Sequence, residues 1–331
     1  MRFLIVLMLA AQLAGCANVL SAGERPAVAG KTYVITGASS GFGKGVALEL
    51  AAMRANVVLA ARRTGALEAV AAEATAKGGN VLVVTTDVSR QEDVQRLLDA
   101  AVARYGRVDV WINNAAVGAI GVYDTIPVED HARVVDVNLK GVLYGSHVAI
   151  RQFRKQGAGT LVNIGSVESV VPQAFHASYS ATKAATLALG RALNEELRLT
   201  GAGNISVATV LPWATDTPFF THAANYSGGT PRMPLMDEPG KVVEAIVWVS
   251  VHPQEELAVG WKAKAAYAGS RLTPDLAERV AANAAHHYQF ETAPPAPATA
   301  GSLHKAMPEG TGIEDGHRER IERENAARRG D

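Results

Sequence analysis

The stretch Thr32-Tyr33-Val34-Ile35-Thr36-Gly37-Ala38-Ser39-Ser40-Gly41-Phe42-Gly43 decides the fold of this chain. Its first five residues are typical of a buried strand, and a glycine-rich turn then opens a helical run through residues 47–51. Gly37 permits a tight turn, Gly41 lets the backbone approach a pyrophosphate, and Gly43 allows close helix packing. The helix N-terminus adds free N–H groups and a partial positive charge. This context predicts a phosphate cradle, although the spacing Gly-x3-Gly-x-Gly is not the commoner Gly-x-Gly-x-x-Gly.

Short β-branched runs alternate with longer helical ones on either side of this turn, from Lys31 to Tyr267. Further strands are expected at residues 57–61, 81–84, 108–112, 159–164 and 205–211. Buried apolar strands that alternate with helices indicate a parallel sheet covered on both faces. We therefore expect an α/β fold with a Rossmann-type doubly wound parallel sheet, in three α/β/α layers and one domain. Ligands of such sheets bind at the carboxyl ends of the strands.

The composition excludes several classes of function. Hydrophobic residues make up 48% of the 331 residues, which is enough for one large core. The chain carries no net charge, so it has no basic excess with which to bind nucleic acid. Cys16 is the single cysteine, so an intramolecular disulfide framework and a cysteine-based zinc site are excluded. The nine histidines are scattered, and we expect no metal site.

Both ends of the chain are expected to lie outside the folded domain, which we place at residues 25–290. The apolar run from Phe3 to Ala11 is too short to span a bilayer, and Leu13-Ala14-Gly15-Cys16 resembles the lipobox of bacterial lipoproteins, whose cysteine is lipidated. A signal anchor or an early start codon is the alternative interpretation for residues 1–24. Residues 291–331 combine a Pro/Ala linker with a charged, solvated tail, expected to be mobile or marginally helical.

The end of the second strand bears on the choice of cofactor. Ala61-Arg62-Arg63 stands where an enzyme that uses NAD usually has an acidic residue for the ribose hydroxyls. The planar guanidinium of Arg62 can instead pair with a 2′-phosphate, which favours NADP(H), with NAD(H) as the alternative. The alternative is that both arginines are solvated side chains at the start of a helix and do not contact a cofactor.

Tyr179-Ser180-Ala181-Thr182-Lys183 supplies a candidate catalytic pair, and Ser166 precedes the tyrosine by thirteen residues. Residues four apart lie on one face of a helix, so the Lys183 ammonium is expected beside the Tyr179 phenol. The ammonium should lower the pKa of the phenol from its usual value of about 10. Such a phenol could exchange a proton with a substrate oxygen that the Ser166 hydroxyl holds.

Together these motifs resemble the Tyr-x-x-x-Lys branch of the short-chain dehydrogenase/reductase family, over about residues 28–250. The resemblance also rests on Asp87 after the third strand, on Asn113-Asn114-Ala115-Ala116 and on Asn138. It implies that Ser166 orients the substrate oxygen and that Tyr179 transfers the proton. It further implies that Lys183 lowers the pKa of the phenol and binds the nicotinamide ribose. Asn138 is implied to support a helix backbone and a water that relays protons to Lys183. The cofactor residues that it implies are Thr36, Gly37, Ser39, Ser40, Gly41, Phe42, Gly43, Arg62, Arg63, Asp87, Val88, Asn114, Ala115, Ala116, Tyr179, Lys183, Pro212, Thr215 and Thr217.

Two positions depart from the family pattern. Ala116 replaces a glycine in a turn that should tolerate the change. Trp213 stands in Pro212-Trp213-Ala214-Thr215-Asp216-Thr217 where the family has glycine, and it should crowd the cofactor or reshape the substrate entrance.

The predicted activity is reversible hydride transfer between NADP(H) and a carbonyl or secondary alcohol. The alternative is a non-catalytic NADP(H)-binding sensor, or a membrane-anchored scaffold, on the same fold. Residues 212–240 form a long segment beside the site, expected to act as a lid over a hydrophobic small-molecule substrate, or else to pack as core or at a subunit contact. The apolar residues of this segment are Phe219, Phe220, Tyr226, Met233, Leu235 and Met236.

The helix after Tyr179 is rich in small residues, which permits close helix packing and, through the resemblance, implies a homodimer. The C-terminal extension could block further packing into tetramers. The N-terminus predicts a bacterial protein associated with the membrane. A cytoplasmic location is the alternative, because NADP(H) is recycled there.

Overall fold

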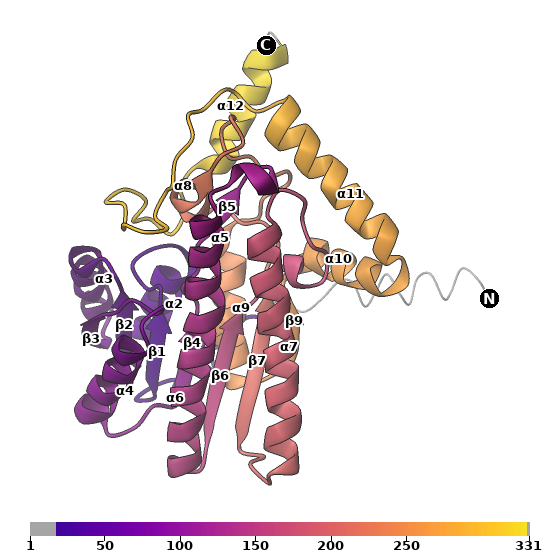
Figure 1. Cartoon of the computed structure of the whole chain (residues 1–331). Helices are drawn as coiled ribbons and strands as arrows, with labels where there is room; N and C mark the ends of the chain where they lie inside the picture. Colours follow the sequence, from indigo (N-terminus) through magenta and orange to yellow (C-terminus); the bar gives the residue numbers. More distant parts are fainter. Residues whose placement is uncertain (1–17, 330–331) are drawn as a thin grey trace.

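The centre of the molecule is a seven-stranded parallel sheet with the strand order β3-β2-β1-β4-β6-β7-β9 (Figure 1). A computed structural model describes residues 18–329. The order runs outward from β1 in both directions, so the predicted doubly wound α/β sheet is confirmed. The strands are β1 (Thr32–Thr36), β2 (Asn56–Ala61), β3 (Asn80–Thr85), β4 (Val110–Asn113), β6 (Gly159–Ile164), β7 (Ile205–Leu211) and β9 (Glu256–Ala258), with β5 (Ala119–Ile120) and β8 (Ala224–Asn225) in a separate pair.

Helices cover both faces of the sheet. The helices of residues 18–329 are α2 (Gly41–Ala52), α3 (Thr64–Ala76), α4 (Gln91–Tyr105), α5 (Val128–Val135), α6 (Gly141–Gln156), α7 (Ala177–Leu199), α8 (Phe219–His222), α9 (Pro239–Val251), α10 (Gly260–Leu272), α11 (Pro274–His286) and α12 (His317–Arg329). Of these, α8, α11 and α12 lie beyond one end of the sheet and not on its faces (Figure 1). Short turns of 3-10 or π type are η1 (Arg25–Ala27), η2 (Tyr123–Thr125), η3 (Asp136–Lys140), η4 (Val167–Ser169) and η5 (His287–Glu291). The long helices α2 and α9 lie against each other, as do α4 and α6.

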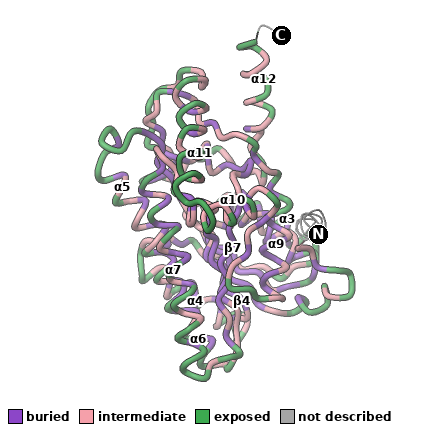
Figure 2. The backbone as a smooth tube through the Cα atoms, turned by 90° about the vertical axis from the view of Figure 1, so that its right-hand side faces the viewer, coloured by how far each residue is buried: buried purple, intermediate pink, exposed green. Residues whose placement is uncertain are grey.

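Two apolar cores lie between the sheet and its helices. Successive residues of a strand point to opposite faces, so Tyr33 and Ile35 of β1 enter the core beneath α2 and α9, whereas Val34 enters the core beneath α4 and α6. Burial on both faces explains why the strands read as continuous apolar runs. Figure 2 shows the strands as the buried centre of the molecule and α11 as one of its most exposed helices.

The first described residues pack on the domain. Leu20 is buried in the core that contains α2 and α9, and Glu24 forms an ion pair with His252 at 2.7 Å. The part of the predicted 1–24 segment that the structure describes is therefore attached to the fold. Cys16 and the lipobox-like sequence lie outside the described residues. Between residues 18 and 329, no helix combines the length and the hydrophobicity needed to cross a bilayer.

The C-terminal segment differs from the predicted linker and solvated tail. Single β-bridges join Asn225 to Thr299 and Gly229 to Pro295. The Asp216 carboxylate accepts the backbone amides of His317 and Arg318, both at 3.0 Å, at the start of α12. The prediction of a poorly packed segment was wrong because these partners lie between 66 and 102 residues away in the sequence, where composition gives no sign of them.

Candidate active site

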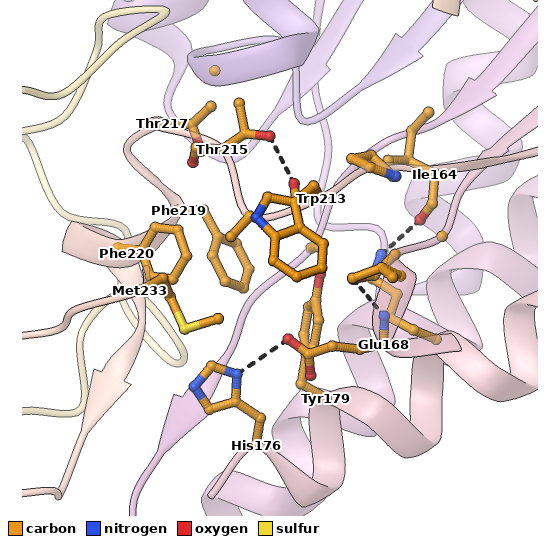
Figure 3. A pocket seen from close by; sticks show the side chains of 18 of the residues that line it. Ile164, Glu168, His176, Tyr179, Trp213, Thr215, Thr217, Phe219, Phe220 and Met233 are labelled. Carbon is orange, nitrogen blue, oxygen red and sulfur yellow. Dashed lines mark hydrogen bonds and ion pairs between the residues drawn. The ribbon is translucent and has the colours of Figure 1, made fainter. Parts of the chain in front are cut away.

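A cavity of about 810 Å³ lies at the carboxyl ends of the strands and brings the predicted motifs together. Of the predicted cofactor residues, all line this cavity except Thr36 and Gly43. Of the predicted catalytic residues, Ser166, Tyr179 and Lys183 line it, whereas Asn138 does not. The cavity is mainly apolar at the end drawn in Figure 3.

The glycine-rich turn packs tightly against the loop after β4. Gly37 has φ +67°, and a Cβ there would lie 2.8 Å from the Ala115 Cα. Asn114 Nδ2 donates to the carbonyls of Thr36 and Gly37, at 2.9 and 3.2 Å, while the Thr36 hydroxyl accepts the Asn114 amide at 3.0 Å. Thr36 and Asn114 therefore shape the turn.

The start of α2 is suited to bind phosphate. A Cβ at Gly43 would lie 2.4 Å from the Gly37 carbonyl oxygen, so only glycine allows this approach. The backbone amides of Phe42 and Gly43 make no hydrogen bond to another residue of the described chain. Unpaired amides at a helix N-terminus are the donors that a pyrophosphate requires. The residues present thus fit a dinucleotide.

Ser166, Tyr179 and Lys183 meet because β6 ends beside the first turns of α7. Ser166 follows β6 and accepts the Glu168 amide on its hydroxyl at 3.1 Å. Lys183 Nζ donates to the Ile164 carbonyl at 2.7 Å and lies 5.4 Å from the centroid of the Tyr179 ring. An ammonium has three protons, so Lys183 keeps two for other partners.

The pKa of Tyr179 shifts in the direction opposite to the prediction. Burial raises it well above its usual range, the Glu168 charge adds to the rise, and a hydrogen bond with Ser166 acts against it. Burial also lowers the pKa of Lys183 to about 8. The prediction of a lowered phenol pKa was wrong because the phenol is desolvated and lies near the Glu168 charge, while the lysine ammonium bonds the Ile164 carbonyl.

Asn138 lies behind the site, on the π-type turn η3. Its Oδ1 accepts the Val117 amide and its Nδ2 donates to the Val117 carbonyl, both at 2.8 Å. Nδ2 also lies 3.3 Å from the Thr182 hydroxyl on α7. Asn138 therefore fixes the loop after β4 to the helix that carries Tyr179.

Arg62 and Arg63, the predicted ligands of a 2′-phosphate, contact the segment 302–312, which we call the C-terminal strap. Arg62 donates to the carbonyls of Ser302 and Leu303 at 2.5 and 3.1 Å. Arg63 donates to three further strap carbonyls, those of Met307, Glu309 and Gly310, at 3.2, 2.8 and 3.3 Å.

The strap also reaches the start of α2 and the wall of the cavity. The Gly41 amide donates to the Gly312 carbonyl at 2.9 Å, and Ser302 and Met307 line the cavity. Sequence reasoning missed the strap, since a main-chain carbonyl leaves no trace in residue type.

Asp87, the predicted adenine contact, lines the cavity but has protein partners. Its carboxylate accepts the Ser89 hydroxyl at 2.7 Å and Arg133 Nη2 at 2.9 Å. Burial opposes the effect of these two partners, yet the pKa of Asp87 is lowered. Arg133 also donates to the Leu303 carbonyl at 2.9 Å, so it ties Asp87 to the strap.

Trp213 lies at the cavity wall and is fixed to the expected lid. Its indole Nε1 donates to the Leu235 carbonyl at 3.1 Å. The Phe219 ring lies 5.2 Å from the Tyr179 ring, centroid to centroid. Of the apolar residues predicted for the lid, Phe219, Phe220, Met233 and Leu235 line the cavity, whereas Tyr226 and Met236 do not.

Two polar residues of the cavity wall, Glu168 and His176, were missed by sequence reasoning. Both are buried, and His176 Nδ1 lies 3.3 Å from Glu168 Oε1 (Figure 3). The available signal was proximity in the chain, because Glu168 lies two residues after Ser166 and His176 three residues before Tyr179.

Comparison with known proteins gives consistent results. A family profile described as short chain dehydrogenase matches residues 31–226. An uncharacterised oxidoreductase of Bacillus subtilis is 34% identical over 86% of this chain and 80% of its own length. The 3beta-hydroxysteroid dehydrogenase 1 of Eggerthella lenta is 38% identical over 57% of this chain and 72% of its own.

Among solved structures, the 3-ketoacyl-(acyl-carrier-protein) reductase from Brucella melitensis, complexed with NADH, is 30% identical with a TM-score of 0.61. The match covers 70% of this chain and 96% of that one. An alcohol dehydrogenase from the archaeon Thermococcus sibiricus, complexed with 5-hydroxy-NADP, is 28% identical with a TM-score of 0.59, over 69% and 94% of the two chains.

Proposed function

Since the chain belongs to the short-chain dehydrogenase family, we propose that it is an NADP(H)-dependent oxidoreductase that transfers hydride reversibly between nicotinamide and a carbonyl or secondary alcohol. The observation that carries the proposal is one cavity lined by Ser166, Tyr179 and Lys183 together with the glycine-rich turn. Proton donors and a dinucleotide cradle in one apolar space are what such a reaction requires.

Each polar group has one part in this proposal. The Ser166 hydroxyl holds the substrate oxygen. Tyr179 gives that oxygen its proton during reduction and takes it back during oxidation, and burial keeps the phenol protonated until substrate binds. Lys183 donates its two remaining protons to hydrogen bonds, one with the nicotinamide ribose and one on the side of the site where the phenol lies. The cofactor, when bound, supplies or accepts the hydride.

The preference for NADP(H) rests on Arg62 and Arg63 at the end of β2, with no acidic side chain at Ala61. Both guanidinium groups lie at the cavity wall, where a 2′-phosphate could bind in the place of the strap carbonyls. The structural relatives bind NADH in one case and 5-hydroxy-NADP in another, so NAD(H) is the alternative.

Hydrophobic carbonyl compounds or alcohols are the proposed substrates. The aromatic and thioether side chains of Phe219, Phe220 and Met233 line the cavity, and the Phe219 ring contacts the Tyr179 ring. A relative named as a hydroxysteroid dehydrogenase supports a large apolar substrate.

Tyr179→Phe tests the proposal. The variant should retain its fold but lose about a hundredfold or more of its NADPH-dependent ketone reduction, because the proton donor is removed. The assay is NADPH oxidation with a panel of ketones, and Tyr123→Phe, at a mostly exposed tyrosine outside the cavity, is the matched control. Retained activity in Tyr179→Phe would overturn the proposal.

A non-catalytic NADP(H) sensor is the second candidate, favoured by the strap contacts at Arg62 and Arg63. It predicts NADPH binding, measured by fluorescence titration, without turnover of any ketone or alcohol. Turnover that depends on Tyr179 would exclude it.

A homodimer and attachment to the membrane complete the proposal. Ala181, Ala184, Ala188 and Ala192 form an exposed small-residue face on α7, which light scattering of the protein can test as a dimer contact. Lipidation at Cys16 predicts that labelled palmitate enters the membrane fraction of bacteria that express the chain and not of the Cys16→Ser variant.

A further inference from the structure

Glu168 is a carboxylate in the apolar part of the cavity, and its burial demands an explanation. The residue is 7% exposed. Ser180 donates its hydroxyl proton to Oε2 at 2.7 Å, and the same hydroxyl accepts the Gln173 amide at 3.1 Å. A desolvated carboxylate is costly unless it is paired. One hydroxyl and one imidazole are its side-chain partners within the described part of the chain.

His176 is the second member of this pair and has a free nitrogen. The side chain is also 7% exposed, and its Nδ1 faces Glu168 Oε1 at 3.3 Å. A carboxylate that accepts the Nδ1 proton fixes the tautomer in which Nε2 carries a lone pair. From residue 18 to residue 329, no side chain or main-chain group bonds Nε2. Figure 3 shows this nitrogen directed away from Glu168, and His176 lines the cavity.

The surroundings of His176 determine which group could bind there. Gln173 is a polar residue of the same loop and lines the cavity, and its side-chain amide donates toward Met233 sulfur at 3.9 Å. Trp213, Phe219 and Met233 are among the apolar residues that line the same cavity. A lone-pair acceptor beside a negative carboxylate repels anions and attracts a hydrogen-bond donor.

We propose that Glu168 and His176 form a recognition subsite that accepts a hydrogen bond from a second hydroxyl of the substrate, at a position other than the reacting carbon. The substrate class is then a hydroxylated apolar ketone, or the corresponding diol. This inference rests on the proposed function. His176 and Glu168 select the substrate, while Ser166 and Tyr179 act on its carbonyl.

Paired probes test the subsite. Each pair consists of a hydroxyketone and its methoxy counterpart, because the methoxy group keeps the size of the substituent and removes the hydrogen-bond donor. The pairs range in size from cyclohexanones to steroids. The protein should prefer hydroxyl over methoxy by at least about tenfold in kcat/KM, the effect of leaving a buried hydrogen-bond partner unpaired. His176→Phe should abolish the preference, so that the hydroxyl and methoxy members of a pair are reduced with nearly equal kcat/KM. His176→Gln keeps an acceptor and should retain part of the preference.

Controls separate the two proposals. His147→Phe, at an exposed histidine of α6 outside the cavity, should change nothing. A preference that is absent, or that survives His176→Phe, would overturn the subsite and leave the oxidoreductase intact. No turnover of any pair by the unaltered protein would overturn the proposed function, and this inference with it.

A second inference comes independently from the strap. Its carbonyls accept the guanidinium protons of Arg62 and Arg63, and the strap is held from elsewhere. The Leu303 side chain is fully buried in the core beneath α4 and α6, and His304 Nε2 lies 2.7 Å from Asp130 Oδ1. We infer that the strap competes with the 2′-phosphate of NADP(H) for the two arginines. The strap, when it bonds the arginines, therefore weakens NADP(H) binding more than NAD(H) binding.

Loosening the strap tests this competition, which rests on the NADP(H) site proposed above. Leu303→Ala and His304→Ala should tighten NADPH about three- to tenfold by increasing the fraction of molecules with free arginines, and should tighten NADH less. Leu199→Ala, at an exposed leucine, is the control. Fluorescence titration measures both cofactors. Equal tightening, no change or weaker NADPH binding would overturn the inference, whereas failure of the unaltered protein to bind either nucleotide would overturn the proposed function.

Discussion

Replacing Lys183 with methionine should stabilise the protein at neutral pH while it removes the ammonium to which we assign a role in catalysis. Lys183 is 3% exposed, and burial lowers its pKa from the ordinary 10.5 to about 8. One pKa unit corresponds to about 1.4 kcal/mol, so the buried ammonium costs roughly 3 kcal/mol of folding free energy at pH 7. Loss of the bond to the Ile164 carbonyl, at 2.7 Å, destabilises the variant by about 1 kcal/mol. The expected net gain is about 2 kcal/mol.

The gain should depend on pH with a defined sign. A cation whose folded pKa lies below its unfolded pKa binds fewer protons when folded, so the native protein becomes more stable as pH rises. For Lys183 this recovery occurs between about pH 8 and pH 10.5. The advantage of Lys183→Met should therefore be full below pH 8 and shrink through that window until it vanishes.

Urea unfolding at pH 7 and at pH 10 measures the effect as a difference between variant and parent. Lys77→Met, at an exposed lysine, is the control and should show the same difference at both pH values. The reasoning fails if Lys183→Met is less stable than the parent at pH 7, or if its advantage does not fall with pH. Ketone reduction by the variant should be nearly lost at every pH.

Two other substitutions give sharp outcomes. Asn138→Ala should lower the free energy of unfolding by about 2–4 kcal/mol, because the buried amide and carbonyl of Val117 both lose their partner; a loss below about 1 kcal/mol in denaturant unfolding would contradict this role. Asp216→Ala should lower the protection of the α12 amides from hydrogen exchange by about three- to thirtyfold, as expected when a capping side chain worth about 0.5–2 kcal/mol is removed; unchanged protection would show that other contacts hold the helix.

The sheet could be predicted because its information is local. The five strand runs that follow β1 in the sequence reading each coincide with an observed strand to within two residues, since burial on both faces produces an unbroken apolar run. The three-residue strand β9 and the two-residue strands β5 and β8 were not predicted, because they are too short to show a period. Their positions depend on pairing with distant partners.

The pKa of Tyr179 shows where spacing alone ceases to predict chemistry. The interval of four residues correctly places Lys183 beside the ring, at 5.4 Å from its centroid. Spacing does not reveal the Ile164 carbonyl that binds the ammonium, nor the Glu168 charge that raises the pKa of the phenol. The carbonyl belongs to the last residue of β6 and Glu168 to the turn η4 after it, and both reach α7 only in the folded chain.

At both ends of the cavity, a polar side chain of the wall keeps bonding capacity that a ligand can use, either by replacing a weaker partner or at an unbonded atom. At the end of the cavity that holds Arg62 and Arg63, neutral strap carbonyls accept the guanidinium protons, whereas a phosphate would form stronger, charge-assisted bonds. At the substrate end, His176 is bonded on one side only, by Glu168 at 3.3 Å. Residue types predicted the two arginines, but neither the strap carbonyls nor the pairing of His176 with Glu168. A carbonyl belongs to every residue, and the lone pair of a histidine nitrogen becomes selective only when folding buries it. Ligand choice in this chain therefore depends on what the fold has already paired with each polar group.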